Sequence, residues 1–314
     1  MTAWQVLAAG AQTTVQDQGR HGWRHLGVGR AGALDTSALA VANLLVGNDE
    51  TAAGLEMALQ GPRLRLPRAC RIALTGAAVP AWWNDVPLPA GRPLDLPAGE
   101  LRFGTLRDGL RAWLAIAGGI AAPSVLGSRS TDLRGGFGGL EGRALVTGDR
   151  LPLGDGTTTP SVRRPTFPSW WVDMDDAWTF DRHVLRYLPS SHAAAESLAA
   201  HAWHAHANSN RQGLRLTGAS LPAGEANGVS EPVAIGTLQL PPDGQPILLL
   251  ADAQTVGGYP RLGHVLACDL GRAAQLRPGE PVHFEPVTAQ KAQTLVRDHA
   301  HRYARVRLAI AQRR

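Results

Sequence analysis

The sequence predicts a mainly β protein in which many short strands build barrels or sandwiches and a few helices are added. The chain of 314 residues contains 36 glycines and 22 prolines, which indicates frequent turns. Between residues 4 and 153, short apolar runs alternate with segments that contain glycine or proline. The length suffices for one large domain or two ordinary domains with buried cores.

The chain opens with an expected strand over residues 4–9 and a polar segment, bounded by glycines, over 10–20. This segment is dense in side chains that form hydrogen bonds. Asp17 and Arg20 form a local ion pair there, or else Arg20 is available to hold an anion. The sequence alone does not separate these two interpretations.

A helix is expected to begin at Asp35, a favourable N-cap, and to end at Gly47, a favourable C-cap residue. Its apolar residues recur at helical spacing and fall on one face. Asn43 lies next to that face. A buried asparagine must have hydrogen-bond partners, so Asn43 either braces the neighbouring loop or contacts a ligand.

Residues 126–131 place Arg129 among three hydroxyl side chains, two of which are Ser130 and Thr131. A guanidinium surrounded by hydroxyls suits a phosphate or a carboxylate, and the alternative is a surface turn. The glycine-rich stretch 135–142 lacks the Gly-Lys-Ser/Thr sequence of a Walker loop, so we expect a flexible loop or lid.

The second half of the chain begins with the best linker candidate, residues 157–168. Strands are expected over 183–188 and 282–284. One helix is expected from Ser190 or Ser191 to about residue 204, and a last helix opens at residue 288. Three histidines near residue 204 lack a carboxylate or cysteine in register, so no metal site is predicted.

The stretch 230–260 is predicted to form a strand, a tight turn, a second strand and a polar loop. Gln239 faces opposite its apolar neighbours in the first strand. The second strand, Ile247–Ala251, is a short apolar run that we expect to be buried. The polar groups that follow it are Asp252, Gln254 and Thr255, and then Tyr259 after two glycines. Such a loop is a candidate site, and the alternative is an ordinary loop in which Asp252 caps a turn.

The charged residues exclude several function classes. The formal net charge is +5, yet the basic residues are scattered, so a nucleic-acid face is not supported. Lys291 is the only lysine, which excludes a P-loop lysine, a Schiff-base lysine or a biotin-carrying lysine at any other position. Cys70 and Cys268 lie in apolar surroundings and are expected to be small buried residues, not a disulfide or a metal pair.

Targeting signals do not stand out in the sequence. No charged-then-apolar segment opens the chain and no apolar run reaches 18 residues. The expectation is therefore a cytoplasmic protein without a membrane partner.

Six motifs in chain order resemble the biotin-dependent carboxyltransferase family. The resemblance runs from about residue 10 to residue 286. This family includes the C subunit of bacterial 5-oxoprolinase, the KipA-type antagonist of a sporulation-kinase inhibitor, and the carboxyltransferase part of urea carboxylase. The motifs are QTTVQDQGRHGWRHLGV, GALDTSALAVANLLVGN, GSRST, SNRQGLRL, SEPVAIGTLQLPPDGQP and LLLADAQTVGGYP.

The resemblance implies two cyclophilin-like β-barrel domains. We place the first at 1–156 and the second at 181–287, joined by a linker at 157–180 and followed by a C-terminal helix at 288–314. It also implies two partner proteins, which are the KipI-like B subunit of 5-oxoprolinase and its lactam-binding A subunit. The implied reaction is the ATP-dependent opening of 5-oxo-L-proline to L-glutamate. The implied cofactors are ATP and Mg²⁺, with no biotin attached to this chain.

For that reaction an unreactive lactam must be activated by phosphoryl transfer, which requires cations, carboxylates and groups that orient an amide. The expected catalytic carboxylates are Asp252, Glu231 and Asp17. The residues expected to bind substrate or ATP are Arg20, Asn43, Arg129, Ser130, Thr131, Asn210, Arg211, Gln239, Gln254, Thr255 and Tyr259. No protein-bound metal site is assigned.

Two alternative functions are a carboxyltransferase that works with biotin on another chain, as in urea carboxylase, and a non-catalytic KipA-like antagonist. The expected result of Asp252→Asn is loss of turnover with folding nearly intact. If Asp252 only caps a turn, asparagine replaces it at little cost. If it pairs with a buried arginine, the substitution lowers the melting temperature.

Overall fold

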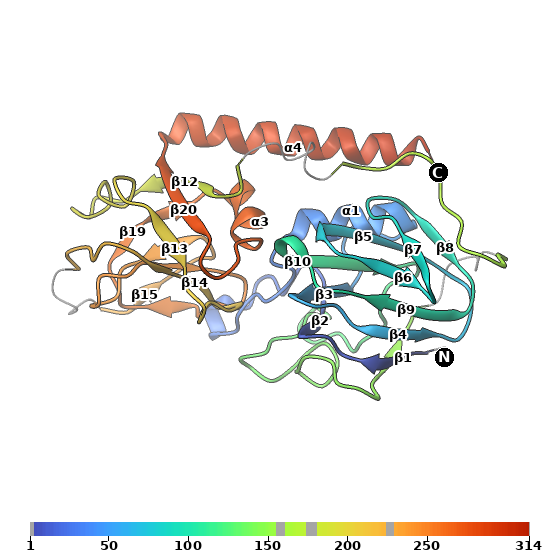
Figure 1. Cartoon of the computed structure of the whole chain (residues 1–314). Helices are drawn as coiled ribbons and strands as arrows, with labels where there is room; N and C mark the ends of the chain where they lie inside the picture. The colour runs from blue at the N-terminus through green and yellow to red at the C-terminus, as the bar shows by residue number, and fades with distance from the viewer. Residues whose placement is uncertain (1–2, 155–160, 174–180, 224–228, 314) are drawn as a thin grey trace. The chain divides into compact units, whose positions relative to one another are not determined.

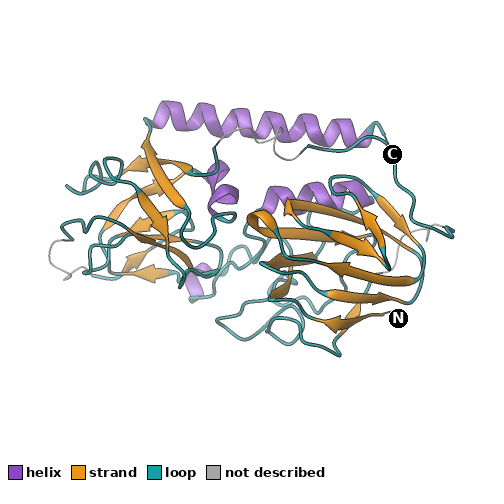
Figure 2. Cartoon of the chain, viewed as in Figure 1, coloured by secondary structure: helices purple, strands orange, loops and turns teal. Residues whose placement is uncertain are grey.

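The computed structural model describes residues 3–154, 161–173, 181–223 and 229–313 (Figure 1). Part of the expected linker, residues 157–160 and 174–180, lies outside the described residues. The chain forms two compact units. Unit 1 comprises Met1–Arg20, Ala31–Trp178 and Tyr303–Arg314, and unit 2 comprises His21–Arg30 and Thr179–Arg302. Strands dominate both units, which confirms the mainly β prediction (Figure 2).

Unit 1 contains two sheets whose strand orders are β11-β1-β4-β9-β6-β7 and β2-β3-β10-β5-β8. Neighbouring strands in both sheets are antiparallel. The strands are β1 (Ala3–Ala8), β2 (Gln12–Gln16), β3 (Gly54–Ala58), β4 (Arg63–Leu66), β5 (Cys70–Ala78), β6 (Ala81–Trp83), β7 (Val86–Leu88), β8 (Leu94–Leu96), β9 (Gly99–Phe103), β10 (Arg107–Ile116) and β11 (Arg150–Pro152).

The core of unit 1 is formed by apolar side chains from both sheets. In β4 the sequence Arg-Leu-Arg-Leu alternates exposed and buried residues, as expected when one face of a strand is covered. Leu64 of β4 belongs to the same fully buried cluster as Leu55 of β3 and Leu114 of β10. The two sheets therefore share one apolar core.

Helix α1 (Thr36–Val46) packs on β5 and β10 of unit 1. The side chain of Asp35 accepts a hydrogen bond from the Ala38 N–H at 2.9 Å, and Gly47 ends the helix at φ 90°, which confirms both predicted caps. All residues from 38 to 46 are buried, so the helix is covered on nearly every side. Part of that cover comes from Ile310, near the end of α4 (Ala289–Ala311).

Unit 2 is a closed barrel with the strand order β12-β19-β16-β17-β14-β13-β20. The first and last strands along the chain, β12 and β20, close it by parallel pairing. A separate two-stranded sheet pairs β15 with β18. The strands are β12 (Val184–Pro189), β13 (Trp203–Ala205), β14 (Gly213–Thr217), β15 (Glu231–Pro232), β16 (Thr237–Gln239), β17 (Ile247–Leu249), β18 (Val256–Gly257), β19 (Arg261–Val265) and β20 (Pro281–Pro286).

Short helical turns complete unit 2, namely η1 (Arg24–Leu26), η2 (Ala267–Asp269) and α3 (Leu270–Ala273). The last helix, α4, begins as predicted after Thr288, whose hydroxyl accepts from the Lys291 N–H at 3.2 Å. Its first turns join the apolar cluster of Leu266 and Val287 through Ala292 and Leu295. Among the described helices, none is both long enough and apolar enough to cross a membrane.

The prediction of a helix from Ser190 or Ser191 to about residue 204 is wrong. This segment forms consecutive turns, with i to i+3 hydrogen bonds such as Ala195 N–H to His192 C=O at 2.9 Å. Side chains take the carbonyls that a helix needs. Tyr187 donates to the Ala195 carbonyl at 2.6 Å, and the Trp203 indole donates to the Leu198 carbonyl at 2.9 Å. These tertiary hydrogen bonds outweigh local helix propensity.

Both cysteines are free, as the sequence predicted. Burial raises the pKa of the Cys70 thiol to about 12 and that of the Cys268 thiol to about 11. These thiols therefore stay protonated near neutral pH and act as small apolar residues.

Candidate functional site

In unit 1 the end of β2 and the loop 127–131 are joined through the buried carboxylate of Asp17. Its Oδ1 accepts from the hydroxyls of Ser128 at 2.6 Å and Ser130 at 2.5 Å, and from the Gly19 N–H at 2.8 Å. Its Oδ2 accepts from the Arg129 N–H at 2.6 Å. Four donors thus converge on one carboxylate, which fixes the loop and occupies most of the acceptor sites of Asp17.

Arg20 is also buried, with 1% of its surface exposed. Its Nη2 donates to the Ser130 carbonyl, and its guanidinium carbon lies 4.5 Å from the centre of the Phe137 ring. A cation over the face of an aromatic ring is attracted by the ring quadrupole. Arg20 therefore links the loop 127–131 to the glycine-rich stretch that contains Phe137.

The glycine-rich stretch packs closely on the loop instead of lying open as a lid. A Cβ atom at Gly139 would lie 1.9 Å from the Thr131 hydroxyl, and one at Gly138 would lie 2.2 Å from the Ser130 carbonyl. Glycine at both positions permits this close approach of two backbones.

Of the residues in the loop, Arg129 points away from the protein, whereas Ser130 and Thr131 point inward. Ser130 and Thr131 are fully buried, and the Thr131 hydroxyl donates to the Val15 carbonyl at 3.1 Å. The Arg129 side chain is exposed, and within the described residues its guanidinium has no hydrogen bond or ion pair. Arg129 is the member of this cluster that is available to an external anion.

Asn43 braces a loop, one of the two alternatives that the sequence left open. Its Nδ2 donates to the Ala52 carbonyl at 2.7 Å, and its Oδ1 accepts from Asn48 at 2.9 Å. The side chain is fully buried, so these bonds satisfy the polar groups that burial removes from water.

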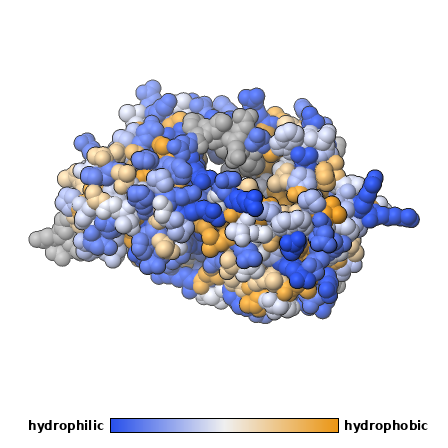
Figure 3. All heavy atoms as spheres, viewed as in Figure 1, coloured by the Kyte–Doolittle hydropathy of each residue, from blue (hydrophilic) through white to orange (hydrophobic). Residues whose placement is uncertain are grey.

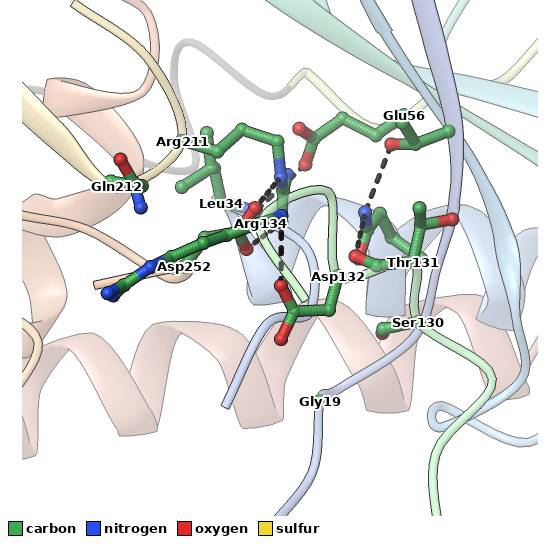
Figure 4. Close-up of polar contacts among 12 residues, drawn as sticks. Gly19, Leu34, Glu56, Ser130, Thr131, Asp132, Arg134, Arg211, Gln212 and Asp252 are labelled. Carbon is green, nitrogen blue, oxygen red and sulfur yellow. Dashed lines mark hydrogen bonds and ion pairs between the residues drawn. The ribbon is translucent and has the colours of Figure 1, made fainter. Parts of the chain in front are cut away.

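Unit 1 also contains a buried acidic residue that sequence reasoning missed. Glu56 of β3 (Figure 4) is 3% exposed. It accepts from the Leu34 N–H at 2.8 Å and from the Trp113 indole at 3.2 Å. Arg111 lies 3.5 Å from it as an ion-pair partner. Burial, with a smaller contribution from the charge of Glu56, raises the pKa of Asp35. The sequence signal for this buried acidic residue was a glutamate inside the apolar run LEMAL.

In unit 2, Asp252 forms a buried bidentate ion pair with Arg211 (Figure 4). Nε of Arg211 lies 3.0 Å from Oδ2 of Asp252, and Nη2 lies 2.9 Å from Oδ1. The side chains of Arg211 and Asp252 are 3% and 1% exposed. The backbone adds a hydrogen bond from the Asp252 N–H to the Arg211 carbonyl at 3.0 Å. Of the roles considered for Asp252, pairing with a buried arginine is the one that these contacts support.

The amides of Gln239 and Gln254 also meet, because Nε2 of Gln254 donates to Oε1 of Gln239 at 3.3 Å. Gln239 is 1% exposed at the end of β16. The Gln254 carbonyl accepts from Nη2 of Arg24 at 3.2 Å. Thr255 is buried next to this pair, and its carbonyl accepts from the Val233 N–H at 3.0 Å.

Arg24 is a second residue that the sequence analysis did not select. It lies in a loop dense in arginine, histidine and glycine, residues 20–30, which overlaps the first of the six motifs, and these were the available signals.

Three other predicted residues lie at the surface of unit 2. Glu231 has 64% of its side chain exposed and pairs with Arg261, whose side chain is 41% exposed. Tyr259 is 45% exposed. Asn210 is exposed, and its Oδ1 accepts from the Gln212 N–H at 2.8 Å, so it closes a local turn.

A groove of about 400 Å³ opens in the surface of unit 2 near Glu231. Its lining is mixed, with apolar residues beside an arginine and a histidine. Burial lowers the pKa of His264, so this imidazole is neutral at neutral pH. The lining residues are Leu188, Ser190, Pro232, Val233, Ala234, Thr237, Arg261, Gly263 and His264.

Within the described residues, no group of three or more acidic, histidine or cysteine side chains is arranged to hold a metal ion. The carboxylates of Asp17 and Asp252 are already bound by donors of the chain itself. Asp17 and Asp252, two of the three expected catalytic carboxylates, are therefore not free to act as Mg²⁺ ligands.

The face of the molecule seen in Figure 3 mixes hydrophilic and hydrophobic residues, shown in blue and orange. Such mixing is ordinary for a folded protein in water.

Comparison with protein families identifies the chain. Residues 26–286 match the family model described as carboxyltransferase domain, subdomain A and B. The chain belongs to the carboxyltransferase family. The matched region includes α1, the loop 127–131 and the whole barrel of unit 2. The family named by the resemblance of the motifs is thus confirmed.

Two bacterial members of this carboxyltransferase family are similar from end to end. The chain is 38% identical to the 5-oxoprolinase C subunit of Escherichia coli over 296 residues, which is 92% of each chain. It is 35% identical to the 5-oxoprolinase C subunit of Haemophilus influenzae, over 93% of this chain and 94% of that protein.

Larger family members contain a similar region. The structure matches urea carboxylase of Kluyveromyces lactis with a TM-score of 0.86 and 30% identity, over 97% of this chain and 29% of that one. It matches the K. lactis urea amidolyase with a TM-score of 0.85 and 30% identity, over 97% of this chain and 20% of that one. The chain therefore corresponds to a fifth to a third of those proteins.

Proposed function

We propose that the chain is the C subunit of an ATP-dependent 5-oxoprolinase that converts 5-oxo-L-proline into L-glutamate together with the A subunit of that enzyme and its KipI-like B subunit. The observation that carries this proposal is the extent of similarity. Both bacterial relatives, each named as the C subunit of 5-oxoprolinase, are matched over more than nine-tenths of their length. The urea amidolyase and urea carboxylase structures are matched over less than a third.

The contacts in the chain favour a role in binding and orientation over proton transfer. Asp17 and Asp252 are engaged by donors of the chain, which leaves Glu231 as the accessible carboxylate of the three expected catalytic ones. The Glu231–Arg261 pair is exposed and therefore weak, so Glu231 can exchange partners without a large cost. Arg129 presents an exposed guanidinium that suits a phosphate oxygen.

ATP would supply the phosphoryl group that turns the lactam oxygen into a leaving group. Of the arginines expected to bind substrate or ATP, Arg129 is the one whose guanidinium is exposed, and no Walker loop accompanies it. Because no cluster of metal ligands is present in the described residues, we assign Mg²⁺ no residue of this chain.

The test is reconstitution with the cognate A and B subunits. We expect release of glutamate from 5-oxo-L-proline that requires ATP and all three chains. Omission of this chain is the first control, and Arg215→Gln is the second, because Arg215 is exposed and outside the candidate sites. A correctly folded complex of the three chains without turnover would reject the proposal.

A second candidate function is transfer of a carboxyl group from carboxybiotin held on another chain. The favouring observation is the TM-score of 0.86 to urea carboxylase over 97% of this chain. The only lysine of this sequence, Lys291, lies in α4 outside a biotin-carrier setting, so the biotin would be carried outside this sequence. Transfer of labelled carboxylate from carboxybiotin to an acceptor, without lactam hydrolysis, would replace the first proposal with this one.

A further inference from the structure

The loop that contains Arg24 belongs to unit 2, where it is held by backbone carbonyls. Nη2 of Arg24 donates to the Val233 carbonyl and, at 3.2 Å, to the Gln254 carbonyl. Within the described residues Arg24 has no acidic partner, and its Nη1 is buried without a hydrogen-bond partner. Neutral carbonyls position a guanidinium, but they do not neutralise its charge.

The surroundings of Arg24 make this positive charge costly. Burial lowers the pKa of Arg24. Burial and the charge of Arg24 also lower the pKa of Arg30, a second cation of the same loop. Two neighbouring, partly desolvated cations are stabilised when an anion binds between or beside them.

A second unpartnered donor belongs to Gln239, which also contacts Gln254. Nε2 of Gln239 is buried and has no hydrogen-bond partner within the described residues. The amide is held in place because its Oε1 accepts from Gln254 and because Gly257 packs against Nε2. A Cβ atom at Gly257 would lie 2.6 Å from Nε2. A buried donor in a fixed position requires an acceptor.

We propose that Arg24, Gln239 and the intervening Gln254 form a binding site for a small carboxylic acid that carries a second oxygen acceptor. Arg24 binds the carboxylate, and Nε2 of Gln239 binds the second oxygen. Nη2 of Arg24 contacts the backbone carbonyl of Gln254, and Oε1 of Gln239 contacts the side-chain amide of the same residue, so Gln254 joins the two residues. The choice of a lactam acid as ligand rests on the proposed function, since 5-oxo-L-proline carries both a carboxylate and a lactam carbonyl.

The experiment measures binding to the full-length chain by isothermal titration calorimetry. The probes are 5-oxo-L-proline, 2-pyrrolidinone, which lacks the carboxylate, and propionate, which lacks the lactam. The variants are Arg24→Gln, Gln239→Met and the matched control Arg215→Gln. Arg24→Lys keeps the charge and provides a second variant if loss of the carbonyl contacts unfolds the loop.

We expect the wild type to bind 5-oxo-L-proline about tenfold or more tightly than 2-pyrrolidinone, as a charged hydrogen bond would give. Arg24→Gln should remove that difference, and Arg24→Lys should keep part of it. Gln239→Met should weaken both lactams and leave propionate unchanged. Arg215→Gln should bind as the wild type does.

Two results separate this site from the proposed function. If the reconstituted complex releases glutamate while folded Arg24→Gln and Arg24→Lys bind 5-oxo-L-proline as the wild type does, the site is rejected and the function stands. If propionate binding depends on Arg24 but the complex has no lactamase activity, the site stands and the function is rejected. Failure of the wild-type chain to bind any of the acids overturns the site.

Discussion

Replacement of Asp252 by asparagine removes one half of the buried ion pair with Arg211. Asparagine has the same size but no charge, and its Nδ2 would face one of the guanidinium N–H groups. The Arg211 charge would then be left in a site where its side chain is only 3% exposed. We therefore expect Asp252→Asn to destabilise unit 2 and not only to impair turnover.

The magnitude follows from the burial of the pair. Removal of one partner of a buried ion pair costs about 3–5 kcal/mol, because the remaining charge is uncompensated. For a protein of this size that cost corresponds to a fall of about 10 °C in melting temperature, at about 2–4 °C per kcal/mol. The free energy of unfolding and the melting temperature are therefore the quantities to measure.

The assay is thermal and urea unfolding of the wild type, Asp252→Asn, Arg211→Leu and the double variant Asp252→Asn/Arg211→Leu. The double variant removes both charges, so its loss of stability should be smaller than the sum of the single losses. Glutamate release should be measured at a temperature where Asp252→Asn is fully folded.

Two results would refute this reasoning. If Asp252→Asn melts within about 1 °C of the wild type and its turnover is abolished, the carboxylate acts in catalysis and the ion pair contributes little to stability. A melting temperature and a turnover that both stay at wild-type values would make Asp252 no more than a turn residue.

Three further predictions concern other parts of the chain. Asp17→Asn should cost about 2–3 kcal/mol and expose the loop 127–131 to proteolysis, because the carboxylate loses charged hydrogen bonds; unchanged unfolding and cleavage would contradict this. Arg129→Gln should change stability by less than about 0.5 kcal/mol yet reduce glutamate release by the complex, and undiminished turnover would remove Arg129 from the site. Burial lowers the pKa of His264 and His299, so both histidines bind protons more readily in the unfolded chain. The free energy of unfolding should therefore fall as pH drops below about 6.5. Urea unfolding from pH 8 to 5 measures this fall, and a variant with both histidines replaced by glutamine should not show it.

Local signals in the sequence were sufficient for the elements whose ends are determined by nearby residues. The caps Asp35 and Gly47 bound α1 as predicted. The turn before Ile247 closes through the Gly244 N–H, which donates to the Pro241 carbonyl at 3.0 Å, and Gly244 has φ 72°. In both cases the determining contacts lie within a few residues of one another.

Contacts between distant residues explain what the sequence did not reveal. Asp17 and Ser130 were each selected, but their direct hydrogen bond spans 113 positions and could not be read from composition. Arg24 meets a carbonyl 209 positions away, so its role depends on the folded chain. The turns at 191–200 replaced an expected helix because Tyr187 and Trp203 take its carbonyls. At these places the sequence indicated which side chains are polar, but it did not indicate which distant groups they contact in the folded chain.

The parallel pairing of β12 with β20 has a consequence for the order of folding during synthesis. Val184 pairs with His283, so the barrel of unit 2 cannot close until about a hundred further residues have left the ribosome. Until then β12 has an unpaired edge, which can pair with another chain. A nascent chain stalled before β20 is therefore the form of this protein most exposed to aggregation or to capture by a chaperone.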